Sequence, residues 1–128
     1  MGIPEFVEKA VAAAIKGSAE VSAICAGKVF PLKIPQGTRL PAVVYQRTHS
    51  SPDSTLAGYT SEGVTLMVNS YAMTYEQAKD LALAVRKAMS AAPLSAVFNG
   101  DRDLFEDGAD VFCVSAEFDC QQYGGFCK

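Results

Sequence analysis

The stretch from Val64 to Ala92, VTLMVNSYAMTYEQAKDLALAVRKAMSAA, contains a strand that leads directly into a helix. Apolar and polar residues first alternate with a period of two, which predicts a strand with one buried face. Val64, Leu66 and Val68 would face the core, and Thr65, Met67 and Asn69 the opposite side. From residue 78 the apolar residues recur at three- and four-residue spacing, which predicts a helix with one buried stripe. The stripe consists of Ala78, Leu81, Ala82, Val85, Ala88, Met89 and Ala92.

Both ends of this helix are marked in the sequence. Thr74 can accept a hydrogen bond from the first turn, and Gln77 follows three residues later, which is the pattern of a capping box. Pro93 marks the end, because proline has no N–H to continue the helix. The segment is therefore predicted to be a core β-α unit.

The residues before this unit predict two helices and two short strands. Ile3 to Lys16 carries an apolar stripe, and Ser18 to Ala26 is predicted to form a second short helical piece. Lys28 to Leu32 is expected to be extended, and three prolines then bracket KIPQGTRL, which predicts an exposed loop. Ala42 to Thr48 alternates again and predicts a strand.

The segment HSSPDSTLAGYTSEG, from His49 to Gly63, is rich in small and polar residues. This composition is compatible with a long mobile loop or with a protruding hairpin. Only Leu56 and Tyr59 could anchor it, so we expect it to be mobile in the isolated subunit and ordered on assembly.

After the central unit, residues 96–106 and 110–120 are predicted to form a hairpin around Asp107-Gly108, a strong turn pair. Its second arm would turn Phe112 and every second residue after it toward the core, with Ser115, Glu117 and Asp119 on the other side. The last eight residues, QQYGGFCK (121–128), are expected to be a loose tail or to dock on a neighbour.

The expected fold is a single α+β domain spanning residues 1–128. Its architecture would be a two-layer sandwich, with an antiparallel sheet of about four strands and two main helices on one face. The formal net charge is −3 and the pI is about 5.0, which gives no global attraction for nucleic acid. The N-terminus lacks the pattern of a secretory signal, and no apolar run is long enough to cross a membrane, so we expect a soluble cytoplasmic product.

No constellation of residues predicts a catalytic, cofactor or metal site. The four cysteines, Cys25, Cys113, Cys120 and Cys127, form no CxxC pair, and Cys113 and Cys120 would lie on opposite faces of one strand. His49 is expected to be a loop histidine in water. A thiol-dependent enzyme built on Cys113 or Cys120 remains an alternative hypothesis.

Charged residues gather in two places. Five carboxylates surround the predicted hairpin turn, at Asp101, Asp103, Glu106, Asp107 and Asp110, without the ordered spacing of a calcium loop. The basic residues Lys28, Lys33, Arg39 and Arg47 gather near Tyr45. Such a group could contact phosphates, so a small nucleic-acid-binding module is a further alternative.

Three segments together resemble small tail-completion proteins, or tail terminators, of long-tailed phages and prophages. They are RLPAVVYQRTHSSPDSTLAG, VTLMVNSYAMTYEQAKDLALAVRKAM and DRDLFEDGADVFCVSAEFD. GKVFPLKIPQG, after the N-terminal helix, fits as well, so the resemblance covers nearly the whole chain. The glycine-rich C-terminus with Cys127 departs from the family pattern.

The resemblance implies a structural virion protein without enzymatic activity or cofactors. Such proteins form a ring, usually hexameric, at the head-proximal end of the tail tube and join tail to head. The implied partners are copies of the chain itself, the tail tube protein and a head-closure or neck protein. DNA would pass through the ring without specific binding, and the free chain could stay monomeric in the host cytoplasm until it meets the tube. A head-closure or other neck protein of similar fold is the neighbouring alternative.

The surface available for assembly would be the outer sheet face and the loops around Lys33 and Asp53. Met67 is the most informative candidate, because it is a large apolar side chain on a face that otherwise reads as polar. The full set of interface candidates is Met67, Thr65, Asn69, Ser115, Lys33, Asp53, Leu56 and Tyr59.

Overall fold

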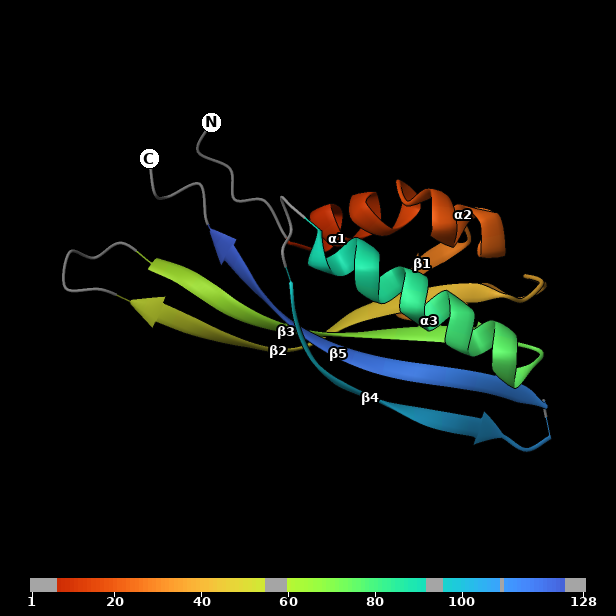
Figure 1. The fold of residues 1–128 in the computed structure, drawn as a ribbon. Coiled ribbons are helices and arrows are strands. Elements are labelled where there is room, and N and C mark those ends of the chain that lie inside the picture. Colours follow the sequence, from red (N-terminus) through yellow and green to blue (C-terminus); the bar gives the residue numbers. More distant parts are fainter. Residues whose placement is uncertain (1–6, 55–59, 92–95, 109, 124–128) are drawn as a thin grey trace.

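The computed structural model describes residues 7–54, 60–91, 96–108 and 110–123, with the backbone alone at 50–54, 60–62 and 121–123. Helices and strands follow one another in the predicted order (Figure 1). They are α1 (Val7–Lys16), α2 (Ala19–Cys25), β1 (Val29–Pro31), β2 (Ala42–Ser54), β3 (Thr60–Ala72), α3 (Tyr75–Ser90), β4 (Val97–Glu106) and β5 (Val111–Tyr123).

Side-chain caps fix where two of the helices begin. The hydroxyl of Thr74 accepts a hydrogen bond from the backbone N–H of Gln77 at 3.2 Å, which confirms the predicted start of α3. Ser18 caps α2 in the same way, with 3.3 Å to the N–H of Val21. Within the described residues, no helix is long and apolar enough to cross a membrane.

The strands form one sheet in the order β1-β2-β3-β5-β4. The antiparallel pairs β2–β3, β3–β5 and β4–β5 supply the four strands that were expected. The sheet nevertheless has a fifth strand, because β1 pairs with β2 in parallel, from Val29 opposite Val43 to Pro31 opposite Tyr45. The sheet is therefore mixed, whereas the sequence predicted a purely antiparallel one.

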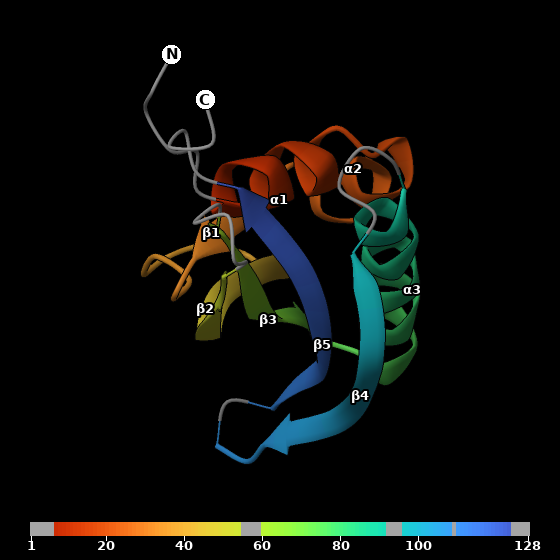
Figure 2. The same ribbon diagram turned by 90° about the vertical axis from the view of Figure 1, so that its left-hand side faces the viewer.

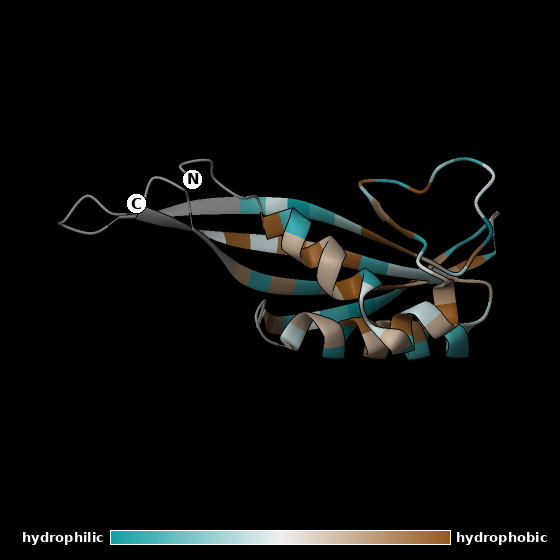
Figure 3. Ribbon diagram, turned by 90° about the horizontal axis from the view of Figure 1, so that it is seen from above, coloured by the Kyte–Doolittle hydropathy of each residue, from teal (hydrophilic) through white to brown (hydrophobic). Residues whose placement is uncertain are grey.

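All three helices of the described chain lie on one face of the sheet, so the fold is the predicted two-layer sandwich (Figure 1). Apolar and polar residues alternate along the strands (Figure 3), and the apolar set that faces the helices forms the core. Its fully buried members include Val11, Ile15, Leu66, Leu81, Met89 and Phe118. In β3 Val64, Leu66 and Val68 are buried, as the period of two predicted, and Ser70 and Ala72 continue the buried face.

In the segment after residue 48, the described residues 49–54 and 60–63 form two paired strands. Backbone pairing between β2 and β3 continues to Ser54 opposite Thr60, and the two strands extend beyond the helical layer (Figure 1). His49 and Asp53 are accordingly strand residues, not loop residues as expected. A bulge between Arg47 and His49 shifts the register of β2. The expected mobility of the segment in the isolated subunit stays a prediction.

The closing hairpin of β4 and β5 is the predicted one, with Gly108 in its turn at φ +82°. Its second strand is longer than expected. Gln121 to Tyr123 continue β5 and pair with residues 61–63 of β3, so the first three residues of the predicted loose tail belong to the sheet. Residues 124–128 lie outside the described chain.

Candidate assembly surface

The sheet face opposite the helices is not covered by another element of the described chain. Figure 2 shows that β4 and β5 bend, so that the face turned away from α3 is concave. We call this surface the outer face. It carries Val44 and Gln46 of β2, Thr65, Met67, Asn69 and Tyr71 of β3, Cys113, Ser115, Glu117 and Asp119 of β5, and Arg102 and Leu104 of β4.

Met67 lies on the outer face, as predicted, and is partly exposed. It lines a shallow hollow of about 270 Å³, together with residues of β4 and β5 that include Arg102 and Glu117. Ser115 lies in the same hollow, but it is only 4% exposed, which corrects the expectation that it is open to a neighbouring subunit. The physical reason is its position in the sheet: the small side chain lies between the longer side chains of Asn69 on β3 and Arg102 on β4.

Thr65 and Asn69 make their polar contacts within the subunit. The hydroxyl of Thr65 donates to a carboxylate oxygen of Asp119 at 3.0 Å. The side-chain amide of Asn69 donates to the hydroxyl of Tyr71 at 3.4 Å, whereas its carbonyl oxygen is buried and has no hydrogen-bond partner among the described residues. A buried carbonyl without a partner costs about 1–3 kcal/mol, so this atom favours a donor from water or from another chain.

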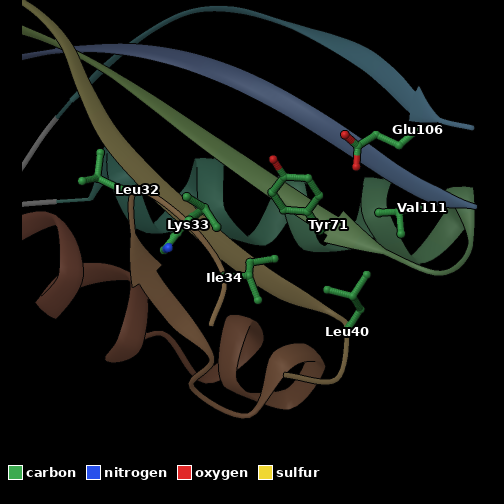
Figure 4. Close-up of a pocket in the computed structure, with 8 residues that line it drawn as sticks. Leu32, Lys33, Ile34, Leu40, Tyr71, Glu106 and Val111 are labelled. Atoms are coloured by element: carbon green, nitrogen blue, oxygen red, sulfur yellow. The ribbon is translucent and has the colours of Figure 1, made fainter. Parts of the chain in front are cut away.

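A groove of about 280 Å³ lies at one end of the outer face. The segment between β1 and β2 forms one side of it, and the end of the β4–β5 hairpin forms the other, with Tyr71 between them (Figure 4). Lys33 and Glu106 are the charged residues that line it. The apolar lining residues are Leu32, Ile34, Leu40, Val44 and Val111.

The structure thus brings some of the predicted interface residues together and not others. Lys33 was predicted as part of a separate loop patch; it is exposed and lines the groove at one end of the outer face. For Asp53 only the backbone is described, and Leu56 and Tyr59 lie outside the described residues. Sequence reasoning missed the apolar part of the groove. Val44 and Val111 occupy outward positions of alternating strands, and an apolar residue in such a position is the signal that could have found it.

Burial sets the properties of the three cysteines that the structure describes. Cys25, Cys113 and Cys120 are buried and free. Cys113 faces Tyr71 on the outer face, whereas Cys120 lies in the core beneath the helices, which confirms that they point to opposite sides. Burial raises the pKa of each of these two thiols to about 11, so neither is a thiolate near neutral pH.

The two charged clusters are partly neutralised inside the subunit. Arg47 binds both carboxylate oxygens of Glu8 at 2.8 and 2.9 Å, which ties β2 to α1 and removes Arg47 from the predicted basic group. Asp103 accepts hydrogen bonds from Lys79 at 2.8 Å and Tyr75 at 2.6 Å. These contacts hold the pKa of Asp103 below its usual range. Within the described residues, no group of three or more potential ligands could hold a metal ion.

Comparison with known proteins identifies the family. Among solved structures, a chain from the virion of a native gene transfer agent particle has a similar fold, with a TM-score of 0.68 and 17% identity over 89% of this chain and 92% of that one. No individually curated protein matches the sequence. The family model described as tail completion protein gp17 matches residues 9–121, which include every helix and strand except the ends of α1 and β5. The chain therefore belongs to the family of the tail completion protein gp17 and is a structural tail-completion protein.

Proposed function

We propose that this tail-completion protein forms a ring, hexameric in the assembled particle, at the head-proximal end of the phage tail tube and joins the tail to the head. The observation that carries the proposal is the family match over residues 9–121. The partners would be further copies of the chain, the tail tube protein and a head-closure or neck protein. The protein would thus reside in the tail or neck of the virion, after synthesis in the host cytoplasm.

The geometry is suited to this role. The helices cover one face of the sheet, while the concave outer face offers two hollows and a partly exposed Met67 to a neighbour. Exposed apolar side chains on otherwise polar surfaces are typical of contacts between proteins. The fold is also shared by a chain from the virion of a gene transfer agent particle, which supports a place in a virion.

We propose that the protein acts without catalysis and that DNA passes through the ring without being gripped. The raised thiol pKa values argue against a cysteine nucleophile. The chain carries a formal net charge of −3, and a mildly acidic wall does not attract a polyanion.

Sedimentation with tail tubes tests the proposal. The purified chain, mixed with its cognate tail tubes, should pellet with them at a saturating ratio of a few chains per tube, because only the tube end offers a site. Binding along the whole length of the tube, or protein that stays in the supernatant, would contradict a ring at the tube end. Binding to isolated heads but not to tubes would favour the alternative of a head-closure or other neck protein.

A further inference from the structure

Two oppositely charged segments of the sequence lie at opposite edges of the sheet. Residues 27–41 contain three basic side chains and no carboxylate, whereas residues 97–110 contain five carboxylates and one arginine. The first segment holds β1 and the second holds β4, which are the two edge strands in the order β1-β2-β3-β5-β4 (Figure 1). We call them the basic edge (Lys28, Leu32, Lys33, Arg39) and the acidic edge (Asp101, Leu104, Phe105, Glu106, Asp107).

Most of these charges have no partner inside the subunit. Lys33 and Arg39 are exposed, and their charged groups form no ion pair within the described residues. The same holds for the carboxylates of Asp101, Glu106 and Asp107, whereas Asp103 is paired with Lys79. Lys28 donates to the backbone carbonyl of Arg39 at 2.8 Å, which fixes the base of the loop that presents the other two basic groups.

Each edge also exposes apolar side chains beside its charges. Leu32 is 71% exposed at the basic edge, and Leu104 and Phe105 are 43% and 48% exposed at the acidic edge. Apolar contacts surrounded by charged groups are the usual composition of a protein interface. Strand pairing is not the expected mode, because β1 has only three residues and ends in Pro31, which has no N–H to donate. The contact would be made by side chains.

We propose that the acidic edge of one subunit binds the basic edge of the next copy of the chain, and that this head-to-tail contact closes the ring. The inference rests on the proposed ring. The two patches belong to opposite edge strands, but Leu32 and Lys33 approach Glu106 across the groove at one end of the outer face. Since the patches differ, each subunit can offer one to each neighbour, which is the heterologous arrangement that rings require. A two-fold contact through either edge alone would place like charges together.

The charges are expected to select orientation and partner. Exposed ion pairs contribute little individually and are screened over about 8 Å at physiological ionic strength. The contact should therefore weaken in salt and form most readily where the tube end already holds neighbouring copies together.

Charge reversal on each edge tests the proposal through assembly on tail tubes. One variant carries Lys33→Glu and Arg39→Glu, so that carboxylates face a neighbour from both edges. The other carries Asp101→Lys and Glu106→Lys, which removes the net negative charge of residues 97–110 and places two added cations on the acidic edge. Each variant alone should bind tube ends about tenfold more weakly than the wild type or worse. An equimolar mixture should recover binding to within about threefold, because acidic and basic subunits can alternate around a ring with an even number of members.

A matched control carries Asp80→Lys and Glu20→Lys, two reversals on exposed helix positions, and should bind as the wild type does. Circular dichroism checks that all variants are folded. If a reversal variant is not folded, a neutral variant of the same edge replaces it: Lys33→Gln with Arg39→Gln, or Asp101→Asn with Glu106→Gln. Each neutral variant should weaken binding less than charge reversal does. Wild-type binding with unaffected variants would overturn the edge contact and leave the ring intact. Weakened variants that fail to complement each other would also overturn it. Failure of the wild type itself to bind tubes would instead contradict the proposed function.

Discussion

At the scale of single residues, neighbours on β3 should differ sharply in their contribution to stability. Leu66 is fully buried between the sheet and the helices, whereas Met67 lies on the outer face and is partly exposed. Leu66→Ala should lower the free energy of unfolding by about 2–5 kcal/mol, because it leaves a cavity in the core. Met67→Ala, the matched control on the adjacent residue, should cost less than about 1.5 kcal/mol. Urea unfolding measures both, and equal losses would mean that the faces of β3 are assigned wrongly.

The buried thiols predict a loss of stability in alkaline solution. Burial raises the pKa of Cys113 and Cys120 from 9.0 to about 11. Because a thiol is neutral when protonated, the unfolded chain loses these protons at a lower pH than the folded chain does. The free energy of unfolding should therefore fall as the pH rises from about 9 to about 11.

Urea midpoints across this pH range test that expectation. Burial also raises the pKa of Tyr71, which adds a decline of the same sign. The variant Cys120→Ala should accordingly show a shallower decline than the wild type, and an unchanged slope would contradict the assignment to this thiol.

At the scale of elements, the start of α3 depends on one side chain. The hydroxyl of Thr74 accepts a hydrogen bond from the backbone N–H of Gln77. The helix contributes Leu81, Val85 and Met89 to the core. Thr74→Ala should lower the free energy of unfolding by about 1 kcal/mol, because one N–H of the first turn loses its acceptor. Thr74→Ser keeps the acceptor and should cost only a few tenths. Thermal or urea unfolding distinguishes the two, and an equal effect would show that the cap is not the cause.

The same elements show what the sequence could predict. The strand and helix of the segment from Val64 to Ala92 follow from local periodicity. Four residues of the expected helical stripe are buried, namely Ala78, Leu81, Val85 and Met89. Ala82 and Ala88 are only partly buried, Ala84 is buried although it was not expected to be, and Ala92 lies outside the described residues. The extended segment that contains β1 was expected, but its parallel pairing with β2 was not. That pairing depends on the chain returning beside it, and three residues are too few to show a period. Charge clusters were visible in the sequence, but their placement at opposite edges follows only from the strand order.

The sequence also did not predict which residues of the outer face are buried. Alternation places Ser115 outward, which is correct, but its 4% exposure depends on its longer neighbours Asn69 and Arg102 on the adjacent strands. The groove likewise combines Val44, Tyr71 and Val111 from three strands, so it depends on register between segments distant in sequence.

At the scale of the whole molecule, assembly should depend on the outer face as well as on the edges. Met67→Asp would place a carboxylate opposite Glu117 of β5, in the hollow that we propose faces another chain. The subunit should stay folded, because the position is outside the core, while assembly on tail tubes should weaken through burial of an unpaired charge. Met67→Leu is the control that keeps the surface apolar. Light scattering with tubes measures assembly, and circular dichroism measures folding. Assembly at the wild-type level would mean that Met67 is not part of an interface. Loss of the fold would contradict its placement on the outer face.

Electron microscopy of tail tubes mixed with the purified chain tests the proposed ring most directly. The free chain can be monomeric, because a contact of moderate area need not close a ring without a template. The prediction is a closed ring, six-fold in end views, on one end of each tube and on no other part of it. Tubes whose ends remain bare at saturating protein would contradict the proposed function.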